Sequence, residues 1–276
     1  AKFNEVVAGT GFRKTGDGTF KVSQNMIFSG TLNVDAGTLQ LGTGFSNGMI
    51  GTSASATDLD VDAVIASGAT LKFFKTNSPL TASGTISGAG TIEMASNDSS
   101  TSSDTLRITG DASGFTGNAN ITNGRLEVGD NATSGSFGGN VLLGSGTQVR
   151  FSRSDAYTFA GDINGAGSLV QEGDSTGNAN FSGEQLILSG NNAYTGGTTI
   201  SAETEIVAAS DSALGTGVVT LGGQDAGLIL NNGITLANDI EISNTSGRNH
   251  IELSSGSLGA VLAGDIAVDN NDVFNF

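Results

Sequence analysis

The sequence from Phe28 to Gly42 reads FSGTLNVDAGTLQLG, and the chain writes this pattern twice more. The second copy, Phe115 to Gly129, is FTGNANITNGRLEVG, and the third, Tyr194 to Ala208, is YTGGTTISAETEIVA. Each copy opens with an aromatic residue and a Ser/Thr-Gly pair, then runs through two short alternating segments joined by a tight turn. A unit that recurs in this way predicts a repeat protein.

The alternation within each copy is typical of β-strands. Leu32 and Val34 alternate with polar residues, and Leu39 and Leu41 do the same after the turn Asp35-Ala36-Gly37. A period of two places the aliphatic side chains on one face of a strand and the polar ones on the other. We therefore expect short strands connected by Gly, Asn and Asp turns.

Composition supports the same fold class. The 276 residues include 43 glycines and one proline, and 37% are apolar against 14% charged, which does not fit a disordered chain. The chain has no cysteine, which excludes disulfides and thiolate metal sites. No apolar run reaches the roughly 18 residues of a membrane span, so direct membrane insertion is not expected.

The net charge of −16 restricts the expected partners. A phosphate backbone would be repelled, so nucleic-acid binding is not expected, and anionic membranes are disfavoured for the same reason. Such acidity fits an extracellular surface, and the partners we expect are other surface proteins, host or cell-surface ligands, or copies of the chain itself.

A longer period joins the copies. Ile86, Ile163 and Ile240 occupy equivalent positions 77 residues apart, and Val141 and Val218 keep the same offset. The offset indicates internal duplication within one β-solenoid domain spanning 1–276. The repeat units it predicts are 12–84, 85–161, 162–240 and a partial unit, 241–276.

Among all-β architectures, a solenoid fits this pattern best. A sandwich would need sequences that differ from sheet to sheet, and propeller blades of about 40 to 50 residues carry a signature that is absent. Coils of about 20 to 25 residues would place about three coils in each period. We predict a right-handed parallel β-helix, which at about 4.8 Å per coil would be a rod on the order of 60 Å long.

Several segments resemble the autotransporter-associated β-strand repeat. They are TGDGTFKV (Thr15 to Val22), Phe28-Ser29-Gly30, AGTLQLG (Ala36 to Gly42), NNAYTGGTTI (Asn191 to Ile200) and SALGTG (Ser212 to Gly217). The resemblance implies a β-helical passenger region of a bacterial outer-membrane autotransporter or a related large surface protein. Such regions are displayed outside the cell, often as adhesins, stalks or surface layers.

The chain departs from that family pattern in three places. No translocator barrel is present, and after Asp265-Ile266 the expected G-x-G-T turn is missing. In the third copy Glu203 replaces the turn glycine, and Glu205 falls where Leu39 points inward. A carboxylate in a solenoid core would need a partner or a proton, so Glu205 is either a perturbed acid or the product of a register slip that turns Ile206 inward. The register slip is the interpretation we favour.

Acidic residues suggest one metal site. Asp58, Asp60 and Asp62 alternate, so on a strand they would share a face and could offer oxygen ligands to Ca²⁺. The competing interpretation is a solvated acidic edge that discourages pairing between sheets. Asp269 and Asp272 form a weaker version of the same motif. Apart from this candidate Ca²⁺, no cofactor is expected.

Other polar residues do not assemble into a catalytic motif. His250 is the only histidine, and we interpret it as part of a polar turn before a strand rather than as a catalytic base. Arg150 and Arg153 lie near Asp155, but no second carboxylate is tied to them by sequence. The aromatic row Phe28, Phe115 and Tyr194 could stack sugars if exposed, although core packing is the expectation.

The sequence therefore favours a non-enzymatic extracellular structural or adhesive rod at the bacterial cell surface, with end-to-end assembly into filaments as a variant. Two alternatives remain open. One is a carbohydrate-active β-helix, either a polysaccharide lyase or a tailspike-like protein, because fold does not determine function. The other is a calcium-stabilised surface-layer module.

Overall fold

The protein is built from short parallel strands. The computed structural model describes residues 11–43, 48–52, 59–74, 79–96, 104–173, 185–243, 248–254 and 259–268, and within these ranges it contains strands and no helix. The strands stack as a β-solenoid with a spacing of about 22 residues per coil, which confirms the predicted fold class. The chain divides into two compact units, residues 1–130 with 134–147 and residues 131–133 with 148–276, here called the N-terminal and C-terminal units.

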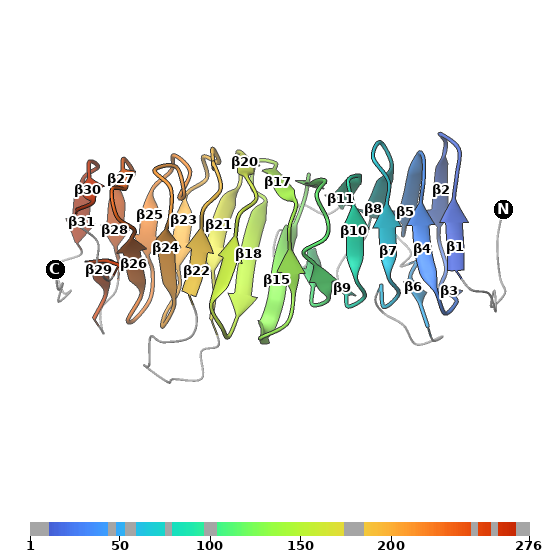
Figure 1. Ribbon diagram of the computed structural model, residues 1–276, viewed down its shortest axis with the longest axis horizontal. Helices are drawn as coiled ribbons and strands as arrows, with labels where there is room; N and C mark the ends of the chain where they lie inside the picture. Colours follow the sequence, from blue (N-terminus) through green and yellow to red (C-terminus); the bar gives the residue numbers. More distant parts are fainter. Residues whose placement is uncertain are drawn as a thin grey trace. The chain divides into compact units, whose positions relative to one another are not determined.

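In the N-terminal unit, successive coils contribute strands to the same sheets (Figure 1). One sheet has the order β1 (Gly11–Lys14), β4 (Thr31–Val34), β7 (Ala63–Ile65) and β10 (Ile86–Gly88). A second has β2 (Thr19–Val22), β5 (Thr38–Leu41), β8 (Thr70–Phe74), β11 (Thr91–Ala95), β14 (Asn118–Ile121) and β17 (Asn140–Leu143). A third has β9 (Leu80–Ala82), β12 (Thr105–Ile108) and β15 (Arg125–Ala132), and the pairs β3 (Met26–Ile27) with β6 (Ile50–Gly51) and β13 (Asp111–Ala112) with β16 (Ser136–Phe137) complete the unit.

The C-terminal unit follows the same plan. One sheet runs through β18 (Gln148–Arg153), β21 (Ser168–Gln171), β23 (Thr198–Ile200), β25 (Val219–Leu221), β28 (Ile240–Ile242) and β31 (Ile266–Val268). Another runs through β19 (Tyr157–Phe159), β22 (Gln185–Leu188), β24 (Glu205–Ala208), β26 (Gly227–Leu230) and β29 (His250–Leu253). The strands β27 (Thr235–Leu236) and β30 (Val261–Leu262) form a pair, and β20 (Ile163–Gly165) receives backbone hydrogen bonds from the segment 193–195.

The pairing register stacks like residues on like residues. Leu39 pairs with Leu71, Leu71 with Ile92, Ile92 with Ala119 and Ala119 with Val141, and each is at most 1% exposed. This ladder is one row of the core in the N-terminal unit. Burying a large aliphatic side chain contributes roughly 1.5–3 kcal/mol, so the rows supply most of the driving force for stacking coils.

Loops absorb the irregular lengths of the repeats. In the second sheet Thr38 follows its partner Thr19 by 19 residues, Thr70 follows Thr38 by 32, and Thr91 follows Thr70 by 21. Register is kept because only the strand residues must stack, while the connections can lengthen at the surface. The predicted boundaries of the 77-residue units remain predictions.

The turns of neighbouring coils touch, and this contact explains one conspicuous glycine. Gly37 has a φ of 64°, and a Cβ on it would lie 2.5 Å from the carbonyl oxygen of Gly16 in the preceding coil. The buried Lys14 ammonium donates hydrogen bonds to the carbonyls of Gly16 (2.6 Å) and Ala36 (2.8 Å), which links the two turns. Gly37 is therefore required both for its backbone conformation and for the close approach of two coils.

Replacing Gly37 by alanine should separate these two requirements. Gly16 also has a positive φ, 75°, but nothing lies within 4 Å of the position its Cβ would take. We expect Gly16→Ala to lower the free energy of unfolding by about 1 kcal/mol, from backbone strain alone. Gly37→Ala should cost a further 1 kcal/mol or more, on the order of an overpacked site, measured by urea denaturation. Equal losses in both variants would contradict the proposed contact between turns.

Candidate functional site

The aspartates proposed to bind calcium serve as hydrogen-bond acceptors in the structure. Asp60 accepts bonds from the amide and the hydroxyl of Thr52, both at 2.7 Å, and Asp62 accepts one from the Thr85 amide at 2.9 Å. Asp58, Asp269 and Asp272 lie outside the described residues. Within the described ranges no three or more His, Cys, Asp or Glu residues are grouped so that they could hold a metal ion. Calcium binding by Asp58, Asp60 and Asp62 stays a prediction.

Elsewhere, aspartates join one coil to the next. Asp162 accepts a hydrogen bond from the Asn191 amide at 2.8 Å, and Asp239 accepts one from the Asp265 amide at 2.9 Å. These two aspartates lie 77 residues apart, so the sequence period reappears as a repeated contact. Much of the acidic excess thus has a structural use, because each carboxylate satisfies a backbone N–H at a turn. Asp211 and Asp225 make equivalent bonds to the amides of Thr235 and Arg248.

Asp111 is the clearest case of such a carboxylate in the N-terminal unit. Its Oδ1 accepts bonds from the Ser136 hydroxyl at 2.6 Å and from the Ser113 amide at 2.9 Å. The Ser136 bond is the largest cause, followed by those to Ser113, and together they lower the pKa of Asp111 to about 2. Hydrogen bonds to the charged form favour ionisation, so this contact holds the coils together best when the carboxylate is charged.

Glu205 and His250 belong to one polar cluster in the C-terminal unit. The interpretation of a shifted register is confirmed, because Ile206 is fully buried and pairs with Leu186 and Leu228. Glu203 takes the glycine-type backbone of the turn with a φ of 61°. Glu205 lies on the alternate face of β24, yet it is only 4% exposed.

Two partners explain how Glu205 is tolerated. Gln185 Nε2 donates to Glu205 Oε2 at 2.6 Å, and His250 Nε2 lies 3.2 Å from Glu205 Oε1. The bond to Glu205 raises the pKa of the half-buried His250 above its ordinary value, with burial opposing the rise. The expectation of His250 as an isolated turn residue was therefore incomplete, since it begins β29 and contacts a residue 45 positions earlier in the chain.

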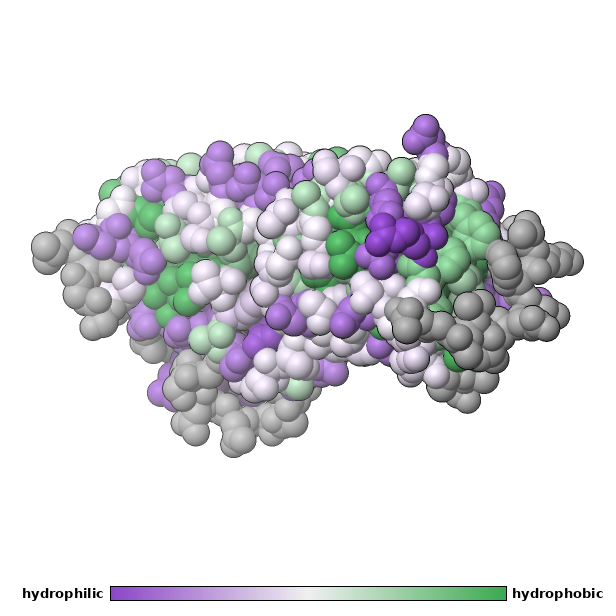
Figure 2. Space-filling view, turned by 45° about the vertical axis from the view of Figure 1, so that its right-hand side comes forward, coloured by the Kyte–Doolittle hydropathy of each residue, from purple (hydrophilic) through white to green (hydrophobic). Residues whose placement is uncertain are grey.

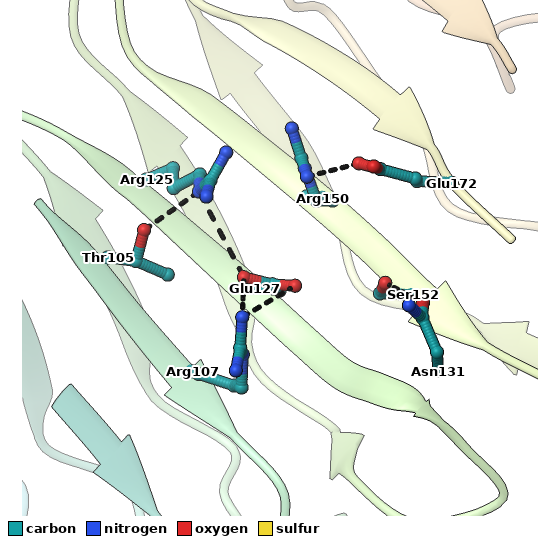
Figure 3. A network of polar contacts seen from close by, with 8 residues as sticks. All are labelled: Thr105, Arg107, Arg125, Glu127, Asn131, Arg150, Ser152 and Glu172. Carbon is teal, nitrogen blue, oxygen red and sulfur yellow. Dashed lines mark hydrogen bonds and ion pairs between the residues drawn. The ribbon is translucent and has the colours of Figure 1, made fainter. Parts of the chain in front are cut away.

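A second charged cluster lies in the N-terminal unit, on β12 and β15 (Figure 3). The buried Glu127 faces Arg107, whose Nη2 lies 3.3 Å from Oε2, and Arg125, whose Nε lies 4.0 Å from the same oxygen. Arg125 Nε also donates to the Thr105 hydroxyl at 2.8 Å. Two guanidinium groups thus flank one carboxylate that is almost removed from water.

The arginines singled out in the sequence lie in the C-terminal unit, and each has a carboxylate. Arg150 on β18 pairs with Glu172 (Figure 3). Arg153 makes two bonds to Asp155, Nε to Oδ1 and Nη2 to Oδ2, both at 2.9 Å, and its guanidinium stands 4.9 Å from the centre of the Tyr157 ring. Such bidentate, stacked geometry orients an arginine within the fold.

Sequence reasoning missed the partners in these clusters. Arg107 and Glu127 are 20 residues apart, as are Gln185 and Glu205, which corresponds to one coil. A search for opposite charges separated by one coil length would have found the first pair. The His250–Glu205 contact spans two coils and needed the actual loop lengths.

The aromatic row is part of the core, as expected. Phe28 is 3% exposed, and Phe115 and Tyr194 are fully buried. The Tyr194 hydroxyl is 2.5 Å from the Thr198 hydroxyl, and burial raises the pKa of Tyr194. These rings cannot stack sugars at the surface. On the face shown in Figure 2, hydrophobic areas are separated by hydrophilic ones.

Comparison with protein families identifies the repeated segments. Residues 12–41, 101–128 and 182–202 match the family model of the passenger-associated-transport-repeat. These segments are passenger-associated-transport repeats. The match confirms the resemblance to autotransporter-associated repeats, and each matched repeat is about as long as one coil. Comparisons with curated proteins and with solved structures found no match.

The described parts of the solenoid that carries these passenger-associated-transport repeats contain no helix of sufficient length and hydrophobicity to cross a membrane. In these parts, the polar clusters around Glu127 and Glu205 sit between neighbouring strands, where they bind coil to coil.

Neutralising Glu127 should destabilise the N-terminal unit. In Glu127→Gln the two guanidinium groups lose their carboxylate while the side-chain shape is kept, and we expect a loss of about 1.5–3 kcal/mol in the free energy of unfolding. Glu93→Gln is the matched control, because the Lys72–Glu93 pair (2.7 Å) is about a quarter exposed and should contribute under about 1 kcal/mol. Denaturation midpoints that shift equally in both variants would refute the structural weight given to Glu127.

The acid sensitivity of Asp111 offers a second test. Because its folded pKa is depressed, its stabilising contribution is complete above the unfolded value of 3.8 and is lost as pH falls towards about 2. Removing the main donor in Ser136→Ala should raise the pKa of Asp111 towards 3.8, measured by carboxyl-carbon NMR. Ser113→Ala keeps the backbone donor and should raise it less. A larger rise in Ser113→Ala than in Ser136→Ala would contradict the assignment.

Proposed function

We propose that this chain is a non-enzymatic structural or adhesive segment of a bacterial surface protein, displayed outside the cell in the manner of an autotransporter passenger region. The observation that carries the proposal is the match of three segments to the passenger-associated-transport-repeat. The name of that repeat associates it with exported passenger regions, and the chain presents it in a stack of parallel coils.

The use of charged side chains supports a structural role. Ion pairs and hydrogen bonds occupy Glu127, Glu205, Arg150 and Arg153, and they join adjacent strands or turns. Residues arranged in this way stabilise a repeat array, whose stability is a sum over neighbouring coils. A solenoid of this kind offers long sheet faces for contact with other surface proteins or with cell-surface ligands, and coils that can pair with further copies.

Electron microscopy of the purified protein, with and without added calcium, tests the assembly part of this proposal. Filaments would show that self-association is its function, because unpaired strand edges are templates for further pairing. Separate particles would direct attention to ligand binding along the sheet faces. Release of unsaturated or shortened sugars from acidic polysaccharides would overturn the non-enzymatic assignment.

The calcium prediction can be examined on the same material. If Asp58, Asp60 and Asp62 bind Ca²⁺, a chelator should lower the melting temperature, since a ligand that binds only the folded state stabilises it. The triple variant Asp58→Asn, Asp60→Asn, Asp62→Asn should then lose its response to calcium. A melting temperature of the wild-type protein that does not change with chelator would remove the calcium-stabilised module from consideration.

A further inference from the structure

One column of residues on the C-terminal unit differs from every neighbouring row. Gln185, Glu205, Gly227 and His250 occupy the same register position on the successive strands β22, β24, β26 and β29. Three of them carry polar side chains that meet, and the fourth has no side chain at all.

The glycine makes the contact between the other residues geometrically feasible. Strands in a sheet lie about 4.8 Å apart, so β29 is about 9.6 Å from β24, with β26 between them. His250 nevertheless reaches Glu205, with Nε2 at 3.2 Å from Oε1. A Cβ on Gly227 would lie 2.4 Å from His250 Cε1 and Nε2 and 2.9 Å from Glu205 Cγ. The imidazole therefore crosses the position that a side chain on β26 would fill.

We propose that His250, Gly227 and Glu205 form an acid-strengthened latch, in which the imidazole crosses the gap left by Gly227 and ties three successive coils of the C-terminal unit together. The backbone ladder joins β24 to β26 and β26 to β29, whereas this contact joins β24 directly to β29. Opening β29 alone would break the latch and leave the 4%-exposed Glu205 without its cationic partner.

The surroundings of the imidazole determine how the latch responds to pH. Glu205 faces it from β24 and Glu252 from its own strand, while β26 presents Gly227 and β22 presents the neutral Gln185. Arg248 precedes the strand, and its amide is bonded to Asp225 at 2.7 Å. The hydrogen bond with Glu205 raises the pKa of His250 above its model value of 6.5, and charge interactions with Glu205 and Glu252 add to this against the opposing effect of burial.

The direction of the pH effect follows from this rise. A group whose pKa is higher in the folded state stabilises that state fully below its unfolded pKa, and the contribution disappears as pH rises through the folded pKa. The latch is therefore closed most firmly below about pH 6.5 and loosens in mildly alkaline solution. Each unit of pKa difference corresponds to a tenfold change in the opening equilibrium.

Because His250 is the only histidine, its ring resonance can be titrated by NMR without assignment. We expect a pKa above 6.5 in the wild-type protein and a lower value in Glu205→Gln, which keeps the size of the side chain and removes its charge. A wild-type value at or below 6.5, or a value unaffected by Glu205→Gln, would overturn the latch. The wild-type titration decides the question even if a variant does not fold.

Hydrogen exchange tests the mechanical consequence. Backbone amides of β26 and β29 should exchange more slowly at pH 5.5 than at pH 8.0, after correction for the intrinsic rate. This protection difference should vanish in His250→Gln and in Gly227→Ala. Gly222→Ala is the matched control, since a Cβ there meets its nearest neighbour at an ordinary 3.5 Å, and it should behave like wild type. Loss of the difference in the control, or its persistence in His250→Gln, would refute the proposal.

Discussion

The parallel backbone ladder between successive coils is the interaction on which the rest of this structure depends. Each strand supplies donors and acceptors that the equivalent strand of the next coil completes, so strand residues stack in register at about 4.8 Å. Once register is set, side chains of equivalent positions form rows through the unit. The row Leu39, Leu71, Ile92, Ala119 and Val141 is one product of that rule.

Close stacking also restricts what the turns can contain. Where a turn of one coil lies directly on a turn of the coil before it, no side chain fits, as the contact between Gly37 and the Gly16 carbonyl shows. Polar turn residues answer the other half of the problem, because backbone N–H groups that leave the ladder still need acceptors. Asp162 and Asp239 accept such bonds from the following coil, so the acidic character of the chain is partly a consequence of its architecture.

Charged side chains on the sheets extend the same logic. An isolated carboxylate as buried as Glu127 or Glu205 would be costly, and each is accommodated because strands one or two coils away bring it a cation or an amide. This economy favours a chain whose charged residues hold coils together over one whose charges converge on a substrate. It fits passenger-associated-transport repeats, in which local contacts between coils are repeated along the array.

The sequence by itself determined the fold class, the inward rows and the family of the repeats. Alternation of apolar and polar residues and the recurrence of FSGTLNVDAGTLQLG carry that information locally, because strand periodicity depends on neighbouring residues. The shifted register at Ile206 and the buried aromatic row could also be predicted from the pattern. Only the tertiary structure decided that Glu205 meets Gln185 and His250, and that Arg107 and Arg125 share Glu127. The physical reason is that these contacts join residues one or two coils apart, and the loop lengths, which range from coil to coil, determine which side chains come into register.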